Sequence, residues 1–201
     1  MTVFTAVGVR GGRVAEVAGA FPLAAEHVLA AAGKKRRINA EQSVSGLYAL
    51  LLLMRHIGAD TRTLSVVRDE GGKPRFAPCG PHFSIAHSAN VAVCALSDSP
   101  VGADVERLRD KPDAVPLAAR FFSEREAECV RSSEDAPREF FRLWTRKEAK
   151  LKKGGEGVDR VMHNVDALGG EFTERVLRFG GEEYLACVTG RAEYIPTEDI
   201  V

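Results

Sequence analysis

Residues 135–155 read DAPREFFRLWTRKEAKLKKGG, and this stretch predicts a helix of about five turns. Proline is tolerated in the first turn of a helix, so Asp135-Ala136-Pro137 marks its start, and Gly154-Gly155 marks its end. At about 100° per residue the apolar side chains fall on one stripe, which we expect to face the core. The stripe consists of Phe140, Leu143, Trp144 and Leu151.

The charged residues of this predicted helix are strongly unbalanced. Residues 142–153 hold six basic side chains and one acid, Glu148. Lys147 lies inside the apolar stripe, where a lysine must either snorkel to water or meet an anion. Glu148 and Lys152 are spaced for a surface ion pair worth about 0.3 to 0.5 kcal/mol, which is the simplest explanation for them. A phosphate together with a metal ion would also explain a single carboxylate among so many cations.

The chain as a whole reads as two halves of similar order, each of which mixes helix with strand. Alternating apolar residues predict strands, and apolar residues at helical spacing predict helices. Ser123-Glu124-Arg125-Glu126 has the form of a capping box and should open a helix. The other expected elements are a strand over 3–9, a helix over 23–32, a helix from Asn39 to Gly58, a hairpin of 83–87 with 91–96, an extended segment over 100–106 and a terminal hairpin of 175–179 with 184–189.

Composition and charge limit the classes of protein to which the chain can belong. It has 201 residues, of which 45% are hydrophobic, and no formal net charge. Such a chain can bury a sizeable core, which excludes disordered and collagen-like classes. The balanced charge argues against wholesale binding of nucleic acid, so any basic site must be local.

The cysteine, histidine and apolar patterns favour a protein of the reducing cytoplasm. The four cysteines are far apart and the five histidines form no tight cluster, so we expect no transition-metal site. The longest apolar run, 50–54, is far shorter than the roughly 20 residues that a bilayer crossing needs. The N-terminus lacks the basic segment and apolar region of an export signal. We therefore expect no membrane contact and no export.

Two carboxylates stand on the extended segment 100–106. Side chains alternate between the faces of an extended chain, so Asp104 and Glu106 should point the same way, about 7 Å apart, while Val105 points into the core. Paired carboxylates without nearby cysteine or histidine suit a hard cation such as Mg²⁺, which commonly bridges substrate phosphates. Spacing alone leaves open the alternative of a solvated strand end whose acids face water or the following arginines, Arg107 and Arg109.

Five short motifs follow one another along the chain: Gly71-Gly72-Lys73-Pro74, Phe83-Ser84-Ile85-Ala86-His87-Ser88, Gly102-Ala103-Asp104-Val105-Glu106, Phe121-Phe122-Ser123 and Trp144-Thr145-Arg146-Lys147-Glu148-Ala149. Their order and spacing resemble the 4'-phosphopantetheinyl transferases of the surfactin-synthetase-activating type. The resemblance implies an α+β fold in which two similar lobes form a pseudo-dimer, with the coenzyme between them. A boundary near 97–100 then gives an N-terminal lobe, 1–99, with the nucleotide contacts, and a C-terminal lobe, 100–201, with the metal and catalytic carboxylates.

The resemblance also implies an activity. Enzymes of this family move 4'-phosphopantetheine from coenzyme A to a serine of an acyl or peptidyl carrier protein, with Mg²⁺, and release 3',5'-adenosine bisphosphate. They serve fatty acid, polyketide or nonribosomal peptide biosynthesis. The expected partners of this chain are therefore a carrier protein and coenzyme A, and we expect a monomer that binds no nucleic acid.

The family's functional residues can be carried over position by position. Asp104, Glu106 and Glu148 would hold the metal, Glu148 would also help to take the serine proton, and Lys152 would contact a phosphate. The remaining coenzyme A contacts would be His87, Lys73 and Lys34. The outward cations of the predicted helix are candidates for docking an acidic carrier protein, and they are Arg146, Lys150 and Lys153.

Some positions depart from the family pattern. Ala86 stands where a serine often touches the coenzyme, Gly46-Leu47 where an Arg-Thr pair is usual, and Ala31 where a further lysine can occur. Without the family context, His87 could equally be a buried hairpin histidine. The basic run 34–37 could likewise be a solvated loop.

Two other functions remain as alternatives. The basic helix could belong to a nucleic-acid or regulatory binding module, against which the zero net charge weighs. The carboxylates could also serve another Mg²⁺-dependent phosphotransferase or a hydrolase. The chain has neither the phosphate-binding G-x-x-x-x-G-K-[ST] motif nor the kinase signatures, which weighs against that second alternative.

Overall fold

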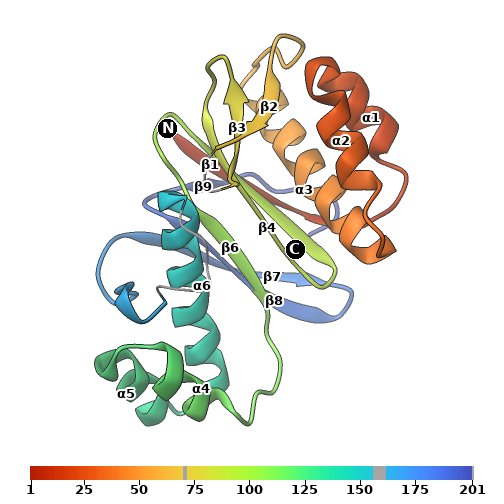
Figure 1. Ribbon diagram of the computed structural model, residues 1–201. Helices are drawn as coiled ribbons and strands as arrows, with labels where there is room; N and C mark the ends of the chain where they lie inside the picture. The colour runs from red at the N-terminus through yellow and green to blue at the C-terminus, as the bar shows by residue number, and fades with distance from the viewer. Residues whose placement is uncertain (70–71, 156–161, 201) are drawn as a thin grey trace.

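The computed structural model describes residues 1–69, 72–155 and 162–200. The first half of the chain folds into a sheet covered by helices (Figure 1). Its sheet has the order β4-β5-β1, and both neighbouring pairs are antiparallel. Its elements are β1 (Thr2–Gly8), α1 (Val14–Ala20), a 3-10 turn (Pro22–Ala24), α2 (Ala25–Ala32), α3 (Arg37–His56), β2 (Ser65–Arg68), β3 (Pro74–Ala77), β4 (His82–Ser88) and β5 (Val91–Ser97).

The second half repeats this order of a strand, helices and a closing hairpin. Its antiparallel sheet has the order β6-β8-β7, and the long helix α6 packs on β6 and β8. Its elements are β6 (Ala103–Arg107), α4 (Ala114–Phe121), α5 (Glu124–Ser132), α6 (Ala136–Gly154), a 3-10 turn (Met162–Asn164), β7 (Phe172–Phe179) and β8 (Glu182–Thr189). The mixed α+β character predicted from the sequence is confirmed.

One apolar cluster and two serine side chains help to join the two halves. The cluster includes Phe4 and Val93 from the first half and Val105 from the second, each at most 1% exposed. Strands β4 and β6 lie side by side (Figure 1), where the Ala103 N–H donates to Ser84 Oγ (3.0 Å) and the Arg107 N–H donates to Ser88 Oγ (3.1 Å). Hydroxyl groups thus take the place of the main-chain carbonyls that a continuous sheet would use.

The last strand returns to the first half. Strand β9 (Glu193–Tyr194) pairs in parallel with β1, and Asp199 forms ion pairs with Arg10 (2.8 Å) and Arg13 (3.0 Å). The end of the chain therefore completes the sheet at its beginning.

Several predicted elements are confirmed and a few are corrected. Helix α6 starts after Asp135, whose carboxylate accepts the Arg138 N–H, and it ends at Gly155, whose φ is 78°. The capping box at Ser123 is present. Helix α3, however, begins at Arg37 rather than at Asn39. Elements α1, α4, β3 and β9 were not predicted from the sequence, and Gly71 of the predicted turn lies outside the described residues.

Among the described residues, no single helix has the length and apolar character needed to cross a bilayer, and one bent pair, Val14–Ala20 with Pro22–Ala32, passes by length and composition alone.

Candidate active site

Gly102 brings the strand with the carboxylates against the long helix. A Cβ atom at this position would lie 1.8 Å from the Ala149 carbonyl oxygen and 2.6 Å from the Lys153 nitrogen, so a side chain has no room here. Val101 and Val105 on either side are each 1% exposed and anchor the strand in the core. The glycine of the G-A-D-V-E motif therefore lets β6 approach the α6 backbone directly.

This approach gathers the three predicted metal ligands. Asp104 is 4% exposed, and Glu106 and Glu148 are half-buried. Burial raises the pKa of Asp104, and the Glu106 carboxylate adds to this. Burial also raises the pKa of Glu148, with a further contribution from Asp104, and it raises the pKa of Glu106, with a contribution from Glu148. The three carboxylates thus interact electrically, as expected for side chains that share one site.

Lys152 supplies the positive charge at the centre of this group. Its ammonium lies 2.6 Å from Asp104 Oδ1 and 3.4 Å from Glu148 Oε2. Burial opposes the charge on Lys152, but Asp104 and Glu148 outweigh it and raise the pKa of the ammonium. The i, i+4 spacing of Glu148 and Lys152 thus belongs to a three-membered network with a buried carboxylate, and the simple surface ion pair is not what the structure contains.

The donor set fits a hard divalent cation. Asp104 Oδ2 is buried and has no hydrogen-bond partner among the described residues, although its companion oxygen holds Lys152. Carboxylate oxygens are the ligands that Mg²⁺ prefers. Within 1–69, 72–155 and 162–200, no three acidic, histidine or cysteine side chains are arranged to hold an ion as they stand. In this conformation Lys152 is the cation that balances the carboxylates.

His87 and Lys34 belong to the first half, and His87 feels the charges of both Lys34 and Lys152. His87 stands on β4 and is exposed. Partial desolvation by neighbouring atoms nevertheless lowers its pKa, and the positive charges of Lys152 and Lys34 lower it further. The Lys34 ammonium donates to Ser43 Oγ (2.7 Å). The structure therefore brings the predicted contacts Lys34, His87 and Lys152 within electrostatic reach of one another.

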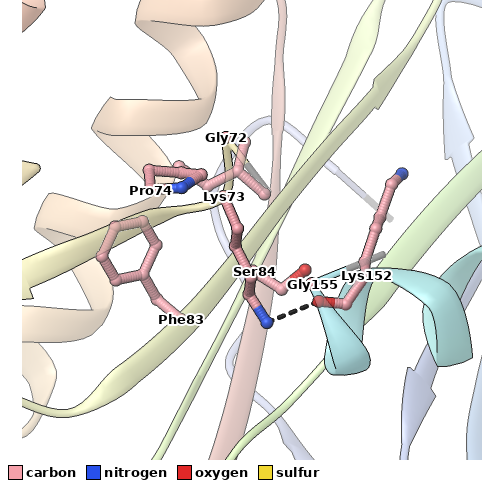
Figure 2. A pocket seen from close by; sticks show the side chains of 8 residues that line it. Gly72, Lys73, Pro74, Phe83, Ser84, Lys152 and Gly155 are labelled. Carbon is pink, nitrogen blue, oxygen red and sulfur yellow. Dashed lines mark hydrogen bonds between the residues drawn. The ribbon is translucent and has the colours of Figure 1, made fainter. Parts of the chain in front are cut away.

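Lys73 lines a cavity of about 230 Å³ together with Ser84 and Lys152 (Figure 2). Its ammonium donates to the Lys152 carbonyl at the C-terminal end of α6, and to the carbonyls of Val101 (3.1 Å) and Lys153 (3.4 Å). Burial lowers the pKa of this lysine. Lys73 thus caps the last turn of α6, where carbonyl oxygens lack helical partners.

The excess of cations on α6 has a structural explanation. Lys147 is fully buried, pairs with Glu126 (2.7 Å) and donates to the Met162 carbonyl (2.9 Å). Of the two outcomes expected for a lysine in the apolar stripe, it therefore meets an anion rather than snorkelling to water. Arg146 pairs with Glu174 (2.6 Å), and Lys150 donates to the Gly169 carbonyl (2.6 Å). Arg146 and Lys150 thus hold neighbouring segments of this half, whereas Lys153 is exposed, and the docking of a carrier protein by these three cations stays a prediction.

The departures from the family pattern are sites of close packing. A Cβ atom at Gly46 would lie 2.4 Å from the Ile85 side chain, so α3 has no room there for a longer residue. Ala86 is 4% exposed, within the apolar cluster between the halves, and Ala31 is 9% exposed. Small residues at these positions let the helices approach β4 and the core.

Two features beside the carboxylates were not predicted from the sequence. Ser88 Oγ donates to Glu106 Oε2 (3.0 Å) from the other half of the molecule. A cavity of about 200 Å³, lined by Phe121 and Trp144 among other aromatic residues, opens next to Glu106 and Glu148. Both features adjoin motifs of the sequence, but the pairing of β4 with β6 that creates the first has no local sequence signal.

Comparison with known proteins agrees with this geometry. Residues 100–197 match the model of the 4'-phosphopantetheinyl transferase superfamily. The chain is 39% identical over 113 residues to the 4'-phosphopantetheinyl transferase HetI of Nostoc sp., covering 53% of this chain and 48% of that protein. It is 35% identical over 105 residues to a 4'-phosphopantetheinyl transferase of Bacillus subtilis, covering 50% and 46% respectively. It is 40% identical over 106 residues to the 4'-phosphopantetheinyl transferase AcpT of Escherichia coli O157:H7, covering 51% and 54%.

The aligned part of the chain spans about half the length of these curated relatives. The stretch that matches the superfamily model contains the carboxylates Asp104, Glu106 and Glu148 together with Lys152. Residues 100–197 of this chain are thus similar to the 4'-phosphopantetheinyl transferase superfamily.

Proposed function

We propose that this chain transfers 4'-phosphopantetheine from coenzyme A to a serine of an acyl or peptidyl carrier protein. The observation that carries the proposal is the buried Asp104, whose unpaired Oδ2 lies in a group with Glu106, Glu148 and Lys152, inside the stretch that matches the superfamily. A buried, unpaired carboxylate oxygen is costly unless a ligand compensates it. Mg²⁺ on these three carboxylates is the ligand that we infer.

The chemistry follows from the residues around this point. The serine hydroxyl oxygen bonds to the phosphorus of coenzyme A that carries the pantetheine. The bond from that phosphorus to the bridging oxygen of the pyrophosphate breaks at the same time. Glu148, whose pKa burial raises, accepts the hydroxyl proton, and 3',5'-adenosine bisphosphate leaves. Lys152 donates to a phosphate oxygen. Bound Mg²⁺ would neutralise charge on the pyrophosphate.

We place the coenzyme between two lobes, 1–99 and 100–201, that form a pseudo-dimer. The repeated order of strand, helices and hairpin supports this division, with β9 exchanged into the first lobe. His87 and Lys34 belong to the first lobe, where His87 feels the charges of Lys34 and Lys152, and they remain our nucleotide contacts. Lys73 lines a cavity with Lys152, and its contact with a phosphate stays a prediction beside its contacts with α6. We further propose that the enzyme is a monomer, that it acts in the cytoplasm, and that it serves biosynthesis on carrier proteins.

The alternative of nucleic-acid binding loses its main support. It relied on the basic residues of α6, and Arg146, Lys147 and Lys150 are committed to partners within the chain. No observation specifically favours another Mg²⁺-dependent phosphotransferase.

Mass spectrometry of apo carrier proteins tests the proposal. Incubation with the full chain, coenzyme A and Mg²⁺ should add about 340 Da to a carrier serine, the mass of phosphopantetheine. Asp104→Ala and Glu106→Ala should abolish this gain while the circular dichroism spectrum stays unchanged. An absence of any mass gain across acyl and peptidyl carriers would contradict the proposed activity, and normal turnover by Asp104→Ala would contradict the metal assignment.

A further inference from the structure

Ser88, the last residue of β4, reaches a carboxylate of the opposite half. Its hydroxyl donates to Glu106 Oε2 (3.0 Å) and accepts the Arg107 N–H (3.1 Å). A serine hydroxyl has one proton to donate, so its single donation is directed at Glu106. The contact joins two chain positions that are 18 residues apart and belong to different sheets.

Ser84, four residues earlier on β4, provides an internal comparison. Its hydroxyl accepts the Ala103 N–H (3.0 Å), as that of Ser88 accepts the Arg107 N–H. Both serines therefore join β4 to β6 in the same way. Of the two serines, Ser88 alone also donates a hydrogen bond to a carboxylate. Its contact with Glu106 is therefore additional to the hydrogen bonds that connect β4 and β6.

The hydrogen bond restricts the Glu106 side chain, which has several rotatable bonds. A glutamate loses rotational freedom when it is fixed as a ligand, and a partner that already fixes it lowers this cost. With Oε2 held by Ser88, the other carboxylate oxygen of Glu106 is left to meet a ligand. The hydroxyl also favours the charged carboxylate and so opposes the effect of burial, which raises the pKa of Glu106.

We propose that Ser88 is a positioning residue that orients Glu106 for a divalent cation, so that contact between β4 and β6 contributes to cation affinity. The proposal rests on the proposed function, because that function requires a cation at Glu106. Groups that orient the ligands of a metal in this way typically change its affinity by about 10- to 100-fold when they are removed.

Binding of Mn²⁺ to the full chain tests the proposal without any turnover. Titration followed by electron paramagnetic resonance should show that Ser88→Ala raises the Kd for Mn²⁺ at least tenfold. Ser88→Thr keeps a hydroxyl on a strand and should restore the Kd to near the wild-type value. Ser84→Ala is the matched control, because it removes a join between the strands without touching a carboxylate, and it should lower Tm while the Kd stays the same.

Steady-state kinetics gives a second test, because a metal-positioning residue should affect the KM for Mg²⁺ more than the other kinetic constants. Ser88→Ala should raise the KM for Mg²⁺ while kcat at saturating Mg²⁺ and the KM for coenzyme A change little.

Each other outcome has a definite meaning. Unchanged Mn²⁺ affinity in Ser88→Ala, or an equal loss in Ser84→Ala, overturns the positioning role. A wild-type chain that binds no Mn²⁺ overturns it together with the metal assignment. A wild-type chain that binds Mn²⁺, weakens as expected in Ser88→Ala and yet modifies no carrier protein contradicts only the proposed function.

Discussion

At Gly102 the strand lies so close to the helix that a Cβ atom would be 1.8 Å from the Ala149 carbonyl oxygen, so the missing side chain is what allows the contact. Asp104 follows two residues later and reaches Lys152 on that helix. The G-A-D-V-E motif therefore combines a packing requirement and a chemical one within five residues.

We predict that Gly102→Ala destabilises the protein by about 1 to 3 kcal/mol, the usual cost of forcing extra atoms into a packed interface. The added methyl group must push β6 away from α6, so Mn²⁺ affinity should fall as well. Urea denaturation and Mn²⁺ titration measure the two effects. Gly19→Ala is the control, since a Cβ atom there meets nothing within 4 Å, and it should leave both unchanged or slightly raise stability.

Lys152 carries the second prediction at this scale, because it balances Asp104 and Glu148 in the absence of a metal. Lys152→Met should lower Tm without Mg²⁺, and Mg²⁺ should then raise Tm more than it does in the wild type. The same variant should lose at least tenfold in kcat/KM, which is about 1.4 kcal/mol. Lys153→Met, which changes an exposed neighbour, should respond to Mg²⁺ like the wild type. Equal Mg²⁺ responses in all three proteins would show that Lys152 does not share the cation's position.

Glu106 makes stability depend on pH. Its pKa in the fold is raised from 4.5, chiefly by burial, so the folded state binds its proton more tightly than the unfolded state. Protonation thus favours folding, and this contribution is lost as pH rises from about 4.5 through the folded pKa. Relative to the wild type in a chelator, Glu106→Gln should therefore gain free energy of unfolding as pH rises, and then level off. A constant difference between pH 4.5 and 7.5 would mean that the carboxylate is not perturbed.

At the scale of elements, helices with clear end signals were predictable and short or unmarked ones were not. Helix α6 has Asp135 at its start and Gly155 at its end, and both were visible in the sequence. Helix α3 starts after Arg36, whose side chain makes no capping hydrogen bond. The true start therefore carries no signal in the sequence, and the predicted N-cap, Asn39, was wrong. Helix α1 has seven residues and β9 has two, which is too short for periodicity to indicate them.

The site was predictable only in part for the same reason. Alternation along β6 placed Asp104 and Glu106 together, but the contact of Ser88 with Glu106 depends on how two sheets meet. The partners of Arg146 and Lys150 lie 28 and 19 residues away, so no local pattern shows that these cations are already paired. Long-range contacts of this kind are decided by packing.

The buried pair of Lys147 with Glu126 ties α6 to α5 and supplies a prediction for these elements. Lys147→Met should destabilise the protein by about 3 kcal/mol or more, because it leaves Glu126 buried without its cation. Adding Glu126→Gln should recover part of this loss, since the amide needs no counter-charge. Urea denaturation of the single and double variants measures the difference. If the double variant is no more stable than the single one, the loss comes from packing rather than from the unpaired charge.

At the scale of the whole molecule, the apolar cluster between the sheets and the pairing of β9 with β1 make the halves depend on each other. We predict a single cooperative unfolding transition. Trp144, the one tryptophan, reports on the second half, and a fluorophore on the exposed Cys79 reports on the first. The two signals should coincide in urea. Separate midpoints would show that the halves unfold independently.

The return of β9 to β1 also has a practical consequence. Cutting the chain between Ser99 and Pro100 would leave the first fragment with a bare sheet edge and the second with a two-residue strand that has nothing to pair with. Because the proposed nucleotide contacts and the three carboxylates fall on opposite sides of that cut, each fragment should be inert alone. Rejoined on two interacting proteins, they would form a fragment-complementation reporter in which recovered carrier labelling signals that the two proteins have met.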